Sequence, residues 1–123
     1  MRPIHKPTTR RERRYRRQLR IRNRVVGTAE RPRLVVFRSL KHIYAHLVDD
    51  DRGIVLMGVG DRSAGVTVEG TGKVAQSKAV GKLLAEKAQA QGITTVVFDR
   101  AGYRYHGRVQ GVADGARDGG LEF

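Results

Sequence analysis

The chain has 123 residues, of which 25 are Lys or Arg and 12 are Asp or Glu, so its formal net charge is +13. This length fits one domain with a modest core, and the absence of cysteine excludes disulfides, thiol chemistry and cysteine-ligated zinc. No apolar run approaches the roughly 20 residues that span a bilayer, so we expect a cytoplasmic protein without a membrane partner, and an organelle transit peptide is the weaker interpretation of the Arg-rich start.

The net charge lies in the first third of the chain. Residues 1–41 hold 15 Lys and Arg against two acidic residues, whereas the charges from His42 onward cancel. A dense cation joined to a neutral body is typical of a polyanion binder, and nucleic acid is the leading candidate because each Arg can displace a counterion from phosphate. We predict a basic RNA-binding arm over residues 1–28 and a single globular domain over residues 29–123.

Residues 9–24 favour a helix because they are mostly good helix formers without Gly or Pro. Arg pairs four residues apart, such as Arg10 and Arg14, each weaken that helix by roughly 0.2–0.5 kcal/mol, so we expect it to become ordered on an anionic partner. A solvated tail is the alternative, but the preference for Arg over Lys favours bidentate phosphate contacts. The arm residues predicted to bind RNA are Arg10, Arg11, Arg13, Arg14, Arg16, Arg17, Arg20, Arg22 and Arg24.

Three short segments predict an antiparallel meander. Residues 33–38 are rich in β-branched and aromatic side chains, and residues 54–59 follow an acidic turn that ends in Gly53. Residues 43–49 alternate with the period of a strand. One face of that strand carries Ile43, Ala45 and Leu47, and the other carries Tyr44, His46 and Val48.

The second half of the chain predicts a crossover to a parallel strand. Residues 58–72 form a Gly-rich loop, residues 73–91 an amphipathic helix that Gly92 ends, and residues 94–99 a nearly uniform apolar strand. Such a strand is typical of a sheet interior, and a helical crossover makes it parallel to a neighbour.

A last helix is predicted over residues 107–118. Gly111 and Gly115 each cost it near 1 kcal/mol relative to Ala, which tertiary packing must offset. Leu121 and Phe123 are expected to dock back on the core. The predicted fold class is therefore α/β: a three-stranded antiparallel meander, a helix crossover, a further parallel strand and a C-terminal helix, preceded by a basic helical arm.

Catalytic chemistry is weakly supported. The stretch from Glu69 to Val74 resembles a phosphate-binding loop but lacks its first Gly and its Ser/Thr magnesium ligand. A magnesium-dependent nuclease would need carboxylates, and those available also suit ordinary turns and strand ends. They are Asp49, Asp50, Asp51, Asp61, Glu69 and Asp99. We predict no enzyme, no cofactor, no metal and no small-molecule substrate.

Two body segments favour RNA contact because they combine cations with hydroxyl or aromatic groups. Residues 38–44 suit phosphate and 2′-OH contacts in a tight hairpin, and residues 100–108 interleave cations and aromatics before a helix start. In the second segment, one Tyr is expected to pack on the core, and His106 has the alternative role of capping the helix. The predicted contacts are Arg33, Arg38, Ser39, Lys41, His42, Tyr44, Arg100, Tyr103, Arg104, Tyr105, His106 and Arg108.

Several motifs resemble one known family. They are Arg31-Pro32-Arg33-Leu34, Lys41-His42-Ile43-Tyr44-Ala45, Val97-Phe98-Asp99-Arg100, Gly102-Tyr103, Tyr105-His106-Gly107-Arg108-Val109 and the ending from Ala113 to Phe123. In this order they are similar to the bacterial form of the large-subunit ribosomal protein eighteen family. The chain departs from the family at Ala101, where Gly or another small residue is usual, and at Leu40, where a polar residue is usual.

The resemblance implies a non-catalytic binder of 5S rRNA. The family's role implies attachment of 5S rRNA to 23S rRNA in the central protuberance, beside neighbouring proteins that include the fifth large-subunit protein. It also implies RNA contacts for the arm, the 38–44 hairpin and the 100–108 loop. The alternatives from the residues alone are the magnesium-dependent nuclease and a general binder of DNA or other polyanions.

Overall fold

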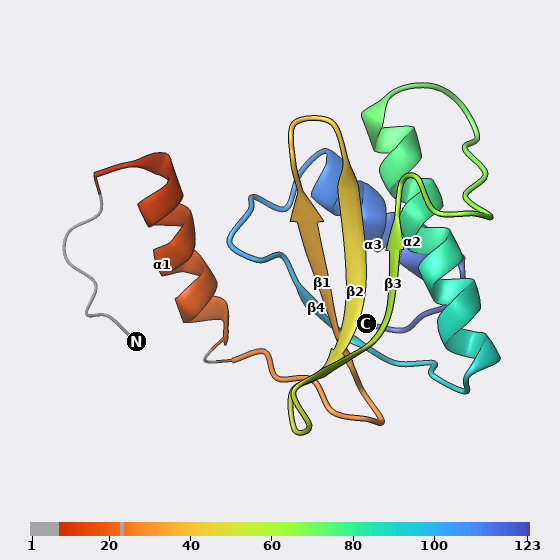
Figure 1. The fold of residues 1–123 in the computed structure, drawn as a ribbon, viewed down its shortest axis with the longest axis horizontal. Coiled ribbons are helices and arrows are strands. Elements are labelled where there is room, and N and C mark those ends of the chain that lie inside the picture. The colour runs from red at the N-terminus through yellow and green to blue at the C-terminus, as the bar shows by residue number, and fades with distance from the viewer. Residues whose placement is uncertain (1–7, 23) are drawn as a thin grey trace.

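A computed structural model describes residues 8–22 and 24–123 of the chain. Along the chain, the elements are α1 (Arg10–Arg22), β1 (Arg33–Arg38), β2 (Ile43–Asp49), β3 (Ile54–Gly60), α2 (Lys73–Ala90), β4 (Val97–Asp99) and α3 (Arg108–Asp118). The predicted α/β class is confirmed: α2 and α3 pack on a mixed sheet, and α1 stands to one side of it (Figure 1). None of the described helices is long and apolar enough to cross a membrane.

The sheet has the strand order β3-β2-β1-β4. Antiparallel pairing joins β1 to β2 and β2 to β3, and β4 runs parallel to β1. The predicted meander and the predicted parallel strand are both confirmed. A register shift at Leu47 and Val48 interrupts the β2–β3 pairing, and the burial of β3 does not alternate regularly.

Strand β4 is shorter than predicted because the residues before it pair with the C-terminal segment. Val96 donates a backbone hydrogen bond to Glu122, and Glu122 donates one to Thr94. Only Val97–Asp99 therefore align with β1. The other bounds differ from the predictions by one or two residues at most.

The core lies between the sheet and the two body helices. Leu34 and Val36 of β1 and Ile43, Ala45 and Leu47 of β2 are all fully buried or nearly so. The three β2 residues share one face, as predicted, and that face points to the core. The tail also docks as predicted. Leu121 is buried, and the Phe123 ring stacks on Phe98 with centroids 5.7 Å apart.

Glycines bring α2 and α3 into close contact. A Cβ atom on Gly115 would overlap the backbone oxygen of Lys78, and one on Gly81 would overlap that of Val112. These glycines lower helix propensity, but they allow the two helix backbones to touch, because any side chain at these positions would push the helices apart.

Candidate nucleic-acid interface

Helix α1 starts at a side-chain cap. The Thr9 hydroxyl accepts a 3.1 Å hydrogen bond from the backbone N–H of Glu12, and the Glu12 carboxylate accepts one of 2.8 Å from the N–H of Thr8. This Thr-x-x-Glu pattern satisfies amides that the first helical turn leaves unpaired. The one acidic residue of α1 thus serves the helix start, and no residue of α1 is buried.

Helix α1 rests on the loop that follows β4. Arg17 Nε donates a 3.0 Å hydrogen bond to the carbonyl oxygen of Gly102, and Arg14 Cζ lies 4.8 Å from the centroid of the Tyr103 ring. Gly102 has φ +78°, and a Cβ atom there would overlap the Arg14 carbonyl oxygen. A glycine is therefore required both by the loop's backbone conformation and by the close approach of α1.

The 38–44 hairpin lies against the same loop. Tyr103 Oη donates a 3.2 Å hydrogen bond to the carbonyl oxygen of Arg38, whose Cζ lies 5.0 Å from the Tyr103 ring centroid. Arg108 Nη2 donates a 2.7 Å bond to the carbonyl oxygen of Ser39. The three segments that the sequence predicts to bind RNA therefore meet at one place, although they are far apart along the chain.

Four arginines converge on Gly102 and Tyr103 without a carboxylate. Three are Arg14, Arg17 and Arg38, and the fourth, Arg100, donates a 2.8 Å bond from Nη1 to the Tyr103 carbonyl oxygen. No carboxylate within residues 8–22 and 24–123 forms an ion pair with any of the four. Their charges are uncompensated, as is expected of a surface that receives phosphate groups.

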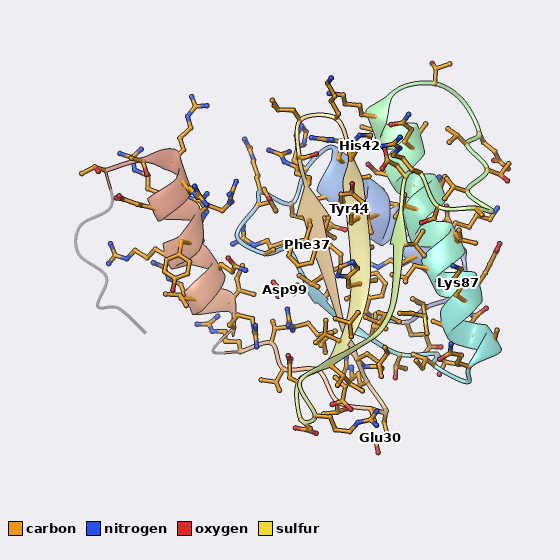
Figure 2. All side chains as sticks on the ribbon, viewed as in Figure 1. Glu30, Phe37, His42, Tyr44, Lys87 and Asp99 are labelled. Atoms are coloured by element: carbon orange, nitrogen blue, oxygen red, sulfur yellow. The ribbon has the colours of Figure 1, made fainter. Side chains whose placement is uncertain are left out.

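The face of the sheet opposite α2 and α3 carries a patch of rings. Phe37 and Tyr44 are register partners on β1 and β2 and are 43% and 39% exposed (Figure 2). The His46 ring lies 5.2 Å from that of Phe37. Gly60 and Gly58 on β3 leave room for the rings, because a Cβ atom on either would come within 2.7 Å of Tyr44 or His46. We name Phe37, Tyr44 and His46 the open-face rings.

Two histidines of this region differ in their surroundings. Burial lowers the pKa of His46 from its ordinary value of 6.5, since desolvation disfavours the imidazolium. His42, which is half-buried, places Nδ1 3.0 Å from Asp61 Oδ2. That contact orients the His42 ring beside Tyr44, with ring centroids 6.5 Å apart.

Arg33 lies in a buried ion-pair network rather than at the surface. Its Nη1 donates a 2.7 Å bond to Asp99 Oδ2, and its Nε donates one of 3.0 Å to Asp50 Oδ2. Burial alone would lower the pKa of Arg33, but the two carboxylates outweigh burial and raise it. Because its guanidinium is engaged inside the protein, we leave Arg33 out of the contact residues that we propose.

Most other predicted contact residues are exposed. They are Arg10, Arg11, Arg13, Arg16, Arg20, Arg24, Lys41, Arg104 and His106. Arg22 is 3.4 Å from Asp50. Tyr105 packs edge-on against Phe98, and its hydroxyl accepts a bond from Arg117.

No side chain caps α3, whose N-cap is Gly107, so His106 does not cap it. Tyr103 is the tyrosine that packs on the core, as the sequence predicts for one of the pair.

Four of the six carboxylates considered for a nuclease have structural partners, namely Asp49, Asp50, Asp61 and Asp99. Asp49 Oδ2 accepts a 2.7 Å bond from Arg52, and Asp99 accepts bonds from Arg33 and from the backbone N–H of Ala101. Within the described part of the chain, no group of three or more His, Cys, Asp or Glu residues is arranged to hold a metal ion.

Phe37 and His46 are members of the patch that the sequence-based contact list omits. The alternation of β2 assigns His46 to the outer face, and the register between β1 and β2 places Phe37 opposite Tyr44. That signal is present in the sequence, but it needs the register between the two strands before it identifies a patch.

Comparisons with known proteins show what the chain is similar to. A family profile described as ribosomal L18 of archaea, bacteria, mitochondria and chloroplast matches residues 8–123. The chain is 52% identical to large ribosomal subunit protein uL18 of Desulforudis audaxviator over 119 residues, covering 94% of this chain and 97% of the relative. It is 46% identical to the uL18 protein of Caldicellulosiruptor saccharolyticus, covering 98% of both chains. With that of Solibacter usitatus it shares 55% identity, covering 85% of this chain and 87% of the relative.

Proposed function

The chain belongs to the ribosomal protein L18 family of the large ribosomal subunit, and we propose that it binds 5S rRNA and helps to attach it to 23S rRNA. The chain is a structural constituent of the large subunit, and the ribosomal names of its relatives confirm the prediction that it is not an enzyme. The proposed assembly is the central protuberance, where the fifth large-subunit protein would be among its neighbours.

One observation carries this proposal: the arm, the 38–44 hairpin and the 100–108 loop share a single surface around Tyr103. Contacts from Arg17, Arg38 and Arg108 join these segments. A surface with several guanidinium groups that have no carboxylate partner can neutralise several phosphates at once, which a folded RNA presents at close spacing.

The segments have different proposed roles. The exposed arginines of α1 bind backbone phosphates, and RNA orders the arm because phosphate removes the repulsion between its charges. Of the predicted arm of residues 1–28, residues 1–7 and 23 lie outside the part of the chain that the structure describes. Ser39, Lys41 and His42 contact phosphate and 2′-OH groups at the hairpin. The open-face rings offer a flat apolar surface on which unpaired bases stack. Residues 29–123 form the domain that holds these groups in place.

A titration of 5S rRNA at increasing salt tests the proposal. If about 6 to 10 phosphates are contacted, the logarithm of the affinity falls with the logarithm of the salt concentration at a slope of roughly −4 to −9. A flat salt response would overturn the proposal. Competition by excess duplex DNA at moderate salt separates specific from general polyanion binding, because a specific RNA complex survives it. Equal competition by DNA would favour the general binder.

A further inference from the structure

We propose that Asp50 is a positioning residue that sets the direction in which the basic arm leaves the body. This inference rests on the proposed RNA binding, because the arm matters for affinity only if it contacts RNA. Asp50 lies at the turn after β2, it is not a predicted contact residue, and its charge has the wrong sign for direct contact with phosphate.

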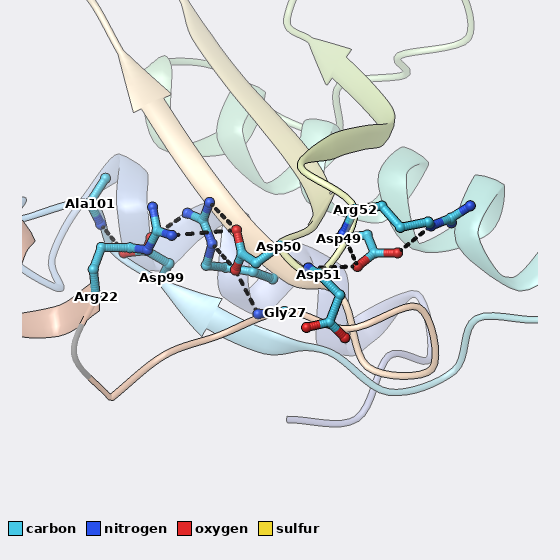
Figure 3. A network of polar contacts seen from close by, with 9 residues as sticks. Arg22, Gly27, Asp49, Asp50, Asp51, Arg52, Asp99 and Ala101 are labelled. Carbon is cyan, nitrogen blue, oxygen red and sulfur yellow. Dashed lines mark hydrogen bonds and ion pairs between the residues drawn. The ribbon is translucent and has the colours of Figure 1, made fainter.

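Asp50 bonds to two positions of the arm, the last residue of α1 and Gly27 (Figure 3). Its Oδ1 lies 3.4 Å from Nη2 of Arg22, the last residue of α1. Its Oδ2 accepts a 2.7 Å bond from the backbone N–H of Gly27, and its own N–H donates a 3.0 Å bond to the Gly27 carbonyl oxygen. One residue thereby holds the arm at both Arg22 and Gly27.

The chain has little conformational freedom at Gly27. Gly27 is buried, and a Cβ atom there would overlap the backbone N of Arg33 and the carbonyl oxygen of Val48. The chain therefore passes directly against the sheet, and Asp50 supplies the hydrogen bonds that keep it there.

The same network extends to the other place where the arm touches the body. Asp50 holds Arg33 through two bonds of 3.0 and 3.1 Å, and Arg33 holds Asp99. Asp99 Oδ1 accepts a 2.8 Å bond from the N–H of Ala101, next to the Gly102 carbonyl that receives Arg17. The contacts of the arm with Asp50 and with Gly102 are thus connected through the buried guanidinium of Arg33.

Because Asp50 is negatively charged, an effect of its charge on RNA binding can be distinguished from an effect of its position. Removing a negative charge near a polyanion strengthens binding if charge alone matters. Removing a positioning residue weakens binding, because part of the binding free energy is then spent on ordering the arm. The two explanations predict opposite signs for Asp50→Asn.

The experiment compares Asp50→Asn with Asp51→Asn in titrations of a 5S rRNA transcript with the full chain. Asp51 is the matched control, since it is exposed, lies one residue away and changes the charge equally. We expect Asp50→Asn to weaken binding about tenfold, the effect of losing one or two charge-assisted bonds. Asp51→Asn should leave the affinity unchanged or increase it. Equal affinities of the two variants would overturn the inference.

A second comparison separates positioning from damage to the fold. In a full-length chain with Arg10, Arg13, Arg16 and Arg20 replaced by Gln, the arm contributes little, so Asp50→Asn should weaken binding less than twofold. An undiminished tenfold loss in that background would overturn the inference. Absence of salt-dependent binding by the unaltered chain would instead overturn the proposed function.

A distance measurement tests the position of the arm directly. The chain has no cysteine, so spin labels at Tyr15→Cys and Lys87→Cys report only the separation of α1 and α2. With the transcript bound, we expect a narrow distance distribution that broadens in Asp50→Asn and not in Asp51→Asn. An identical distribution in all three chains would overturn the inference. If Asp50→Asn fails to fold, Asp50→Glu keeps the charge, shifts the carboxylate from Gly27 and should broaden the distribution in the same way.

Discussion

The guanidinium of Arg33 and the carboxylate of Asp99 form a buried ion pair, with Nη1 and Oδ2 2.7 Å apart and the Asp99 side chain fully shielded from solvent. This pair joins the start of β1 to the end of β4. The partner left behind by a single substitution would be a buried charge without a counterion.

Replacement of Arg33 by Gln should therefore lower the free energy of unfolding by about 3–5 kcal/mol, the usual cost of breaking a buried pair. Urea titrations followed by circular dichroism measure this. Arg31→Gln is the matched control and should change stability by no more than about 0.5 kcal/mol, because Arg31 is exposed. A loss below about 1 kcal/mol for Arg33→Gln would show that the pair contributes little.

Gly115→Ala should destabilise the protein by about 1–3 kcal/mol, because the added methyl group overlaps the Lys78 carbonyl. At an ordinary helix position, the same change stabilises by about 1 kcal/mol. The sign of the change in the free energy of unfolding therefore shows whether packing requires glycine at position 115 or merely tolerates it. Thermal and urea unfolding give the answer, with the exposed Gln110→Ala as a control near neutrality.

Stability should fall in two steps on acidification. Burial depresses the pKa of His46 below 6.5, so just below pH 6.5 the unfolded chain binds more protons than the folded chain. The contribution of His46 to the free energy of unfolding is therefore fully present above pH 6.5 and declines below it. Burial would raise the pKa of Asp50, but bonds from Arg33 and Gly27 outweigh burial and depress it below 3.8. That contribution is present above pH 3.8 and is lost below it.

Urea titrations between pH 3 and pH 8 measure both steps. In His46→Gln the upper step should disappear while the lower one remains. An unchanged upper step in His46→Gln would assign it to another group.

Tyr103 should matter for RNA affinity through its ring rather than through its hydroxyl. The ring lies under the guanidinium groups of Arg14 and Arg38, and two such contacts contribute about 1–2 kcal/mol. We expect Tyr103→Leu to weaken 5S rRNA binding about 5- to 30-fold and Tyr103→Phe less than about threefold. Equal losses for the two variants would assign the effect to the hydroxyl bond with the Arg38 carbonyl.

Phe37→Ala should weaken RNA binding by about 1–3 kcal/mol if a base stacks on the open-face rings. Its effect on stability should be smaller than that of a core substitution, because the side chain is 43% exposed. Val55→Ala removes a 56% exposed apolar side chain from β3 and serves as the control in the same titration. Equal affinities of the two variants would exclude stacking at Phe37.

Much of the fold could be predicted from local pattern. The bounds of β1 follow from its β-branched and aromatic residues, and those of β2 from alternation and turn residues. The bounds of α2 follow from its apolar rows and from Gly92. The pairing of Thr94 and Val96 with Glu122 could not be predicted, because it joins segments that have no signal in common. It decides where β4 begins.

The candidate site shows the same division. Residue types and spacing identify the arm, the hairpin and the loop, because clustered arginines and interleaved aromatics have few other uses. The burial of Arg33 depends on carboxylates that are distant in the sequence, so an arginine at the start of a strand gives no local sign of it. The requirement for glycine at positions 102 and 115 likewise becomes visible only when the facing backbone is known.

The parallel pairing of β1 with β4 has a consequence for how the protein is made. During synthesis, β1 and β2 leave the translating machinery early, but the strand that completes β1, together with the Leu121 segment packed behind it, is added only near the end. The basic arm of the nascent chain therefore precedes the folded domain for most of the synthesis, because the sheet cannot be completed until β4 has been made. An encounter with nucleic acid in that interval would precede the completion of the sheet.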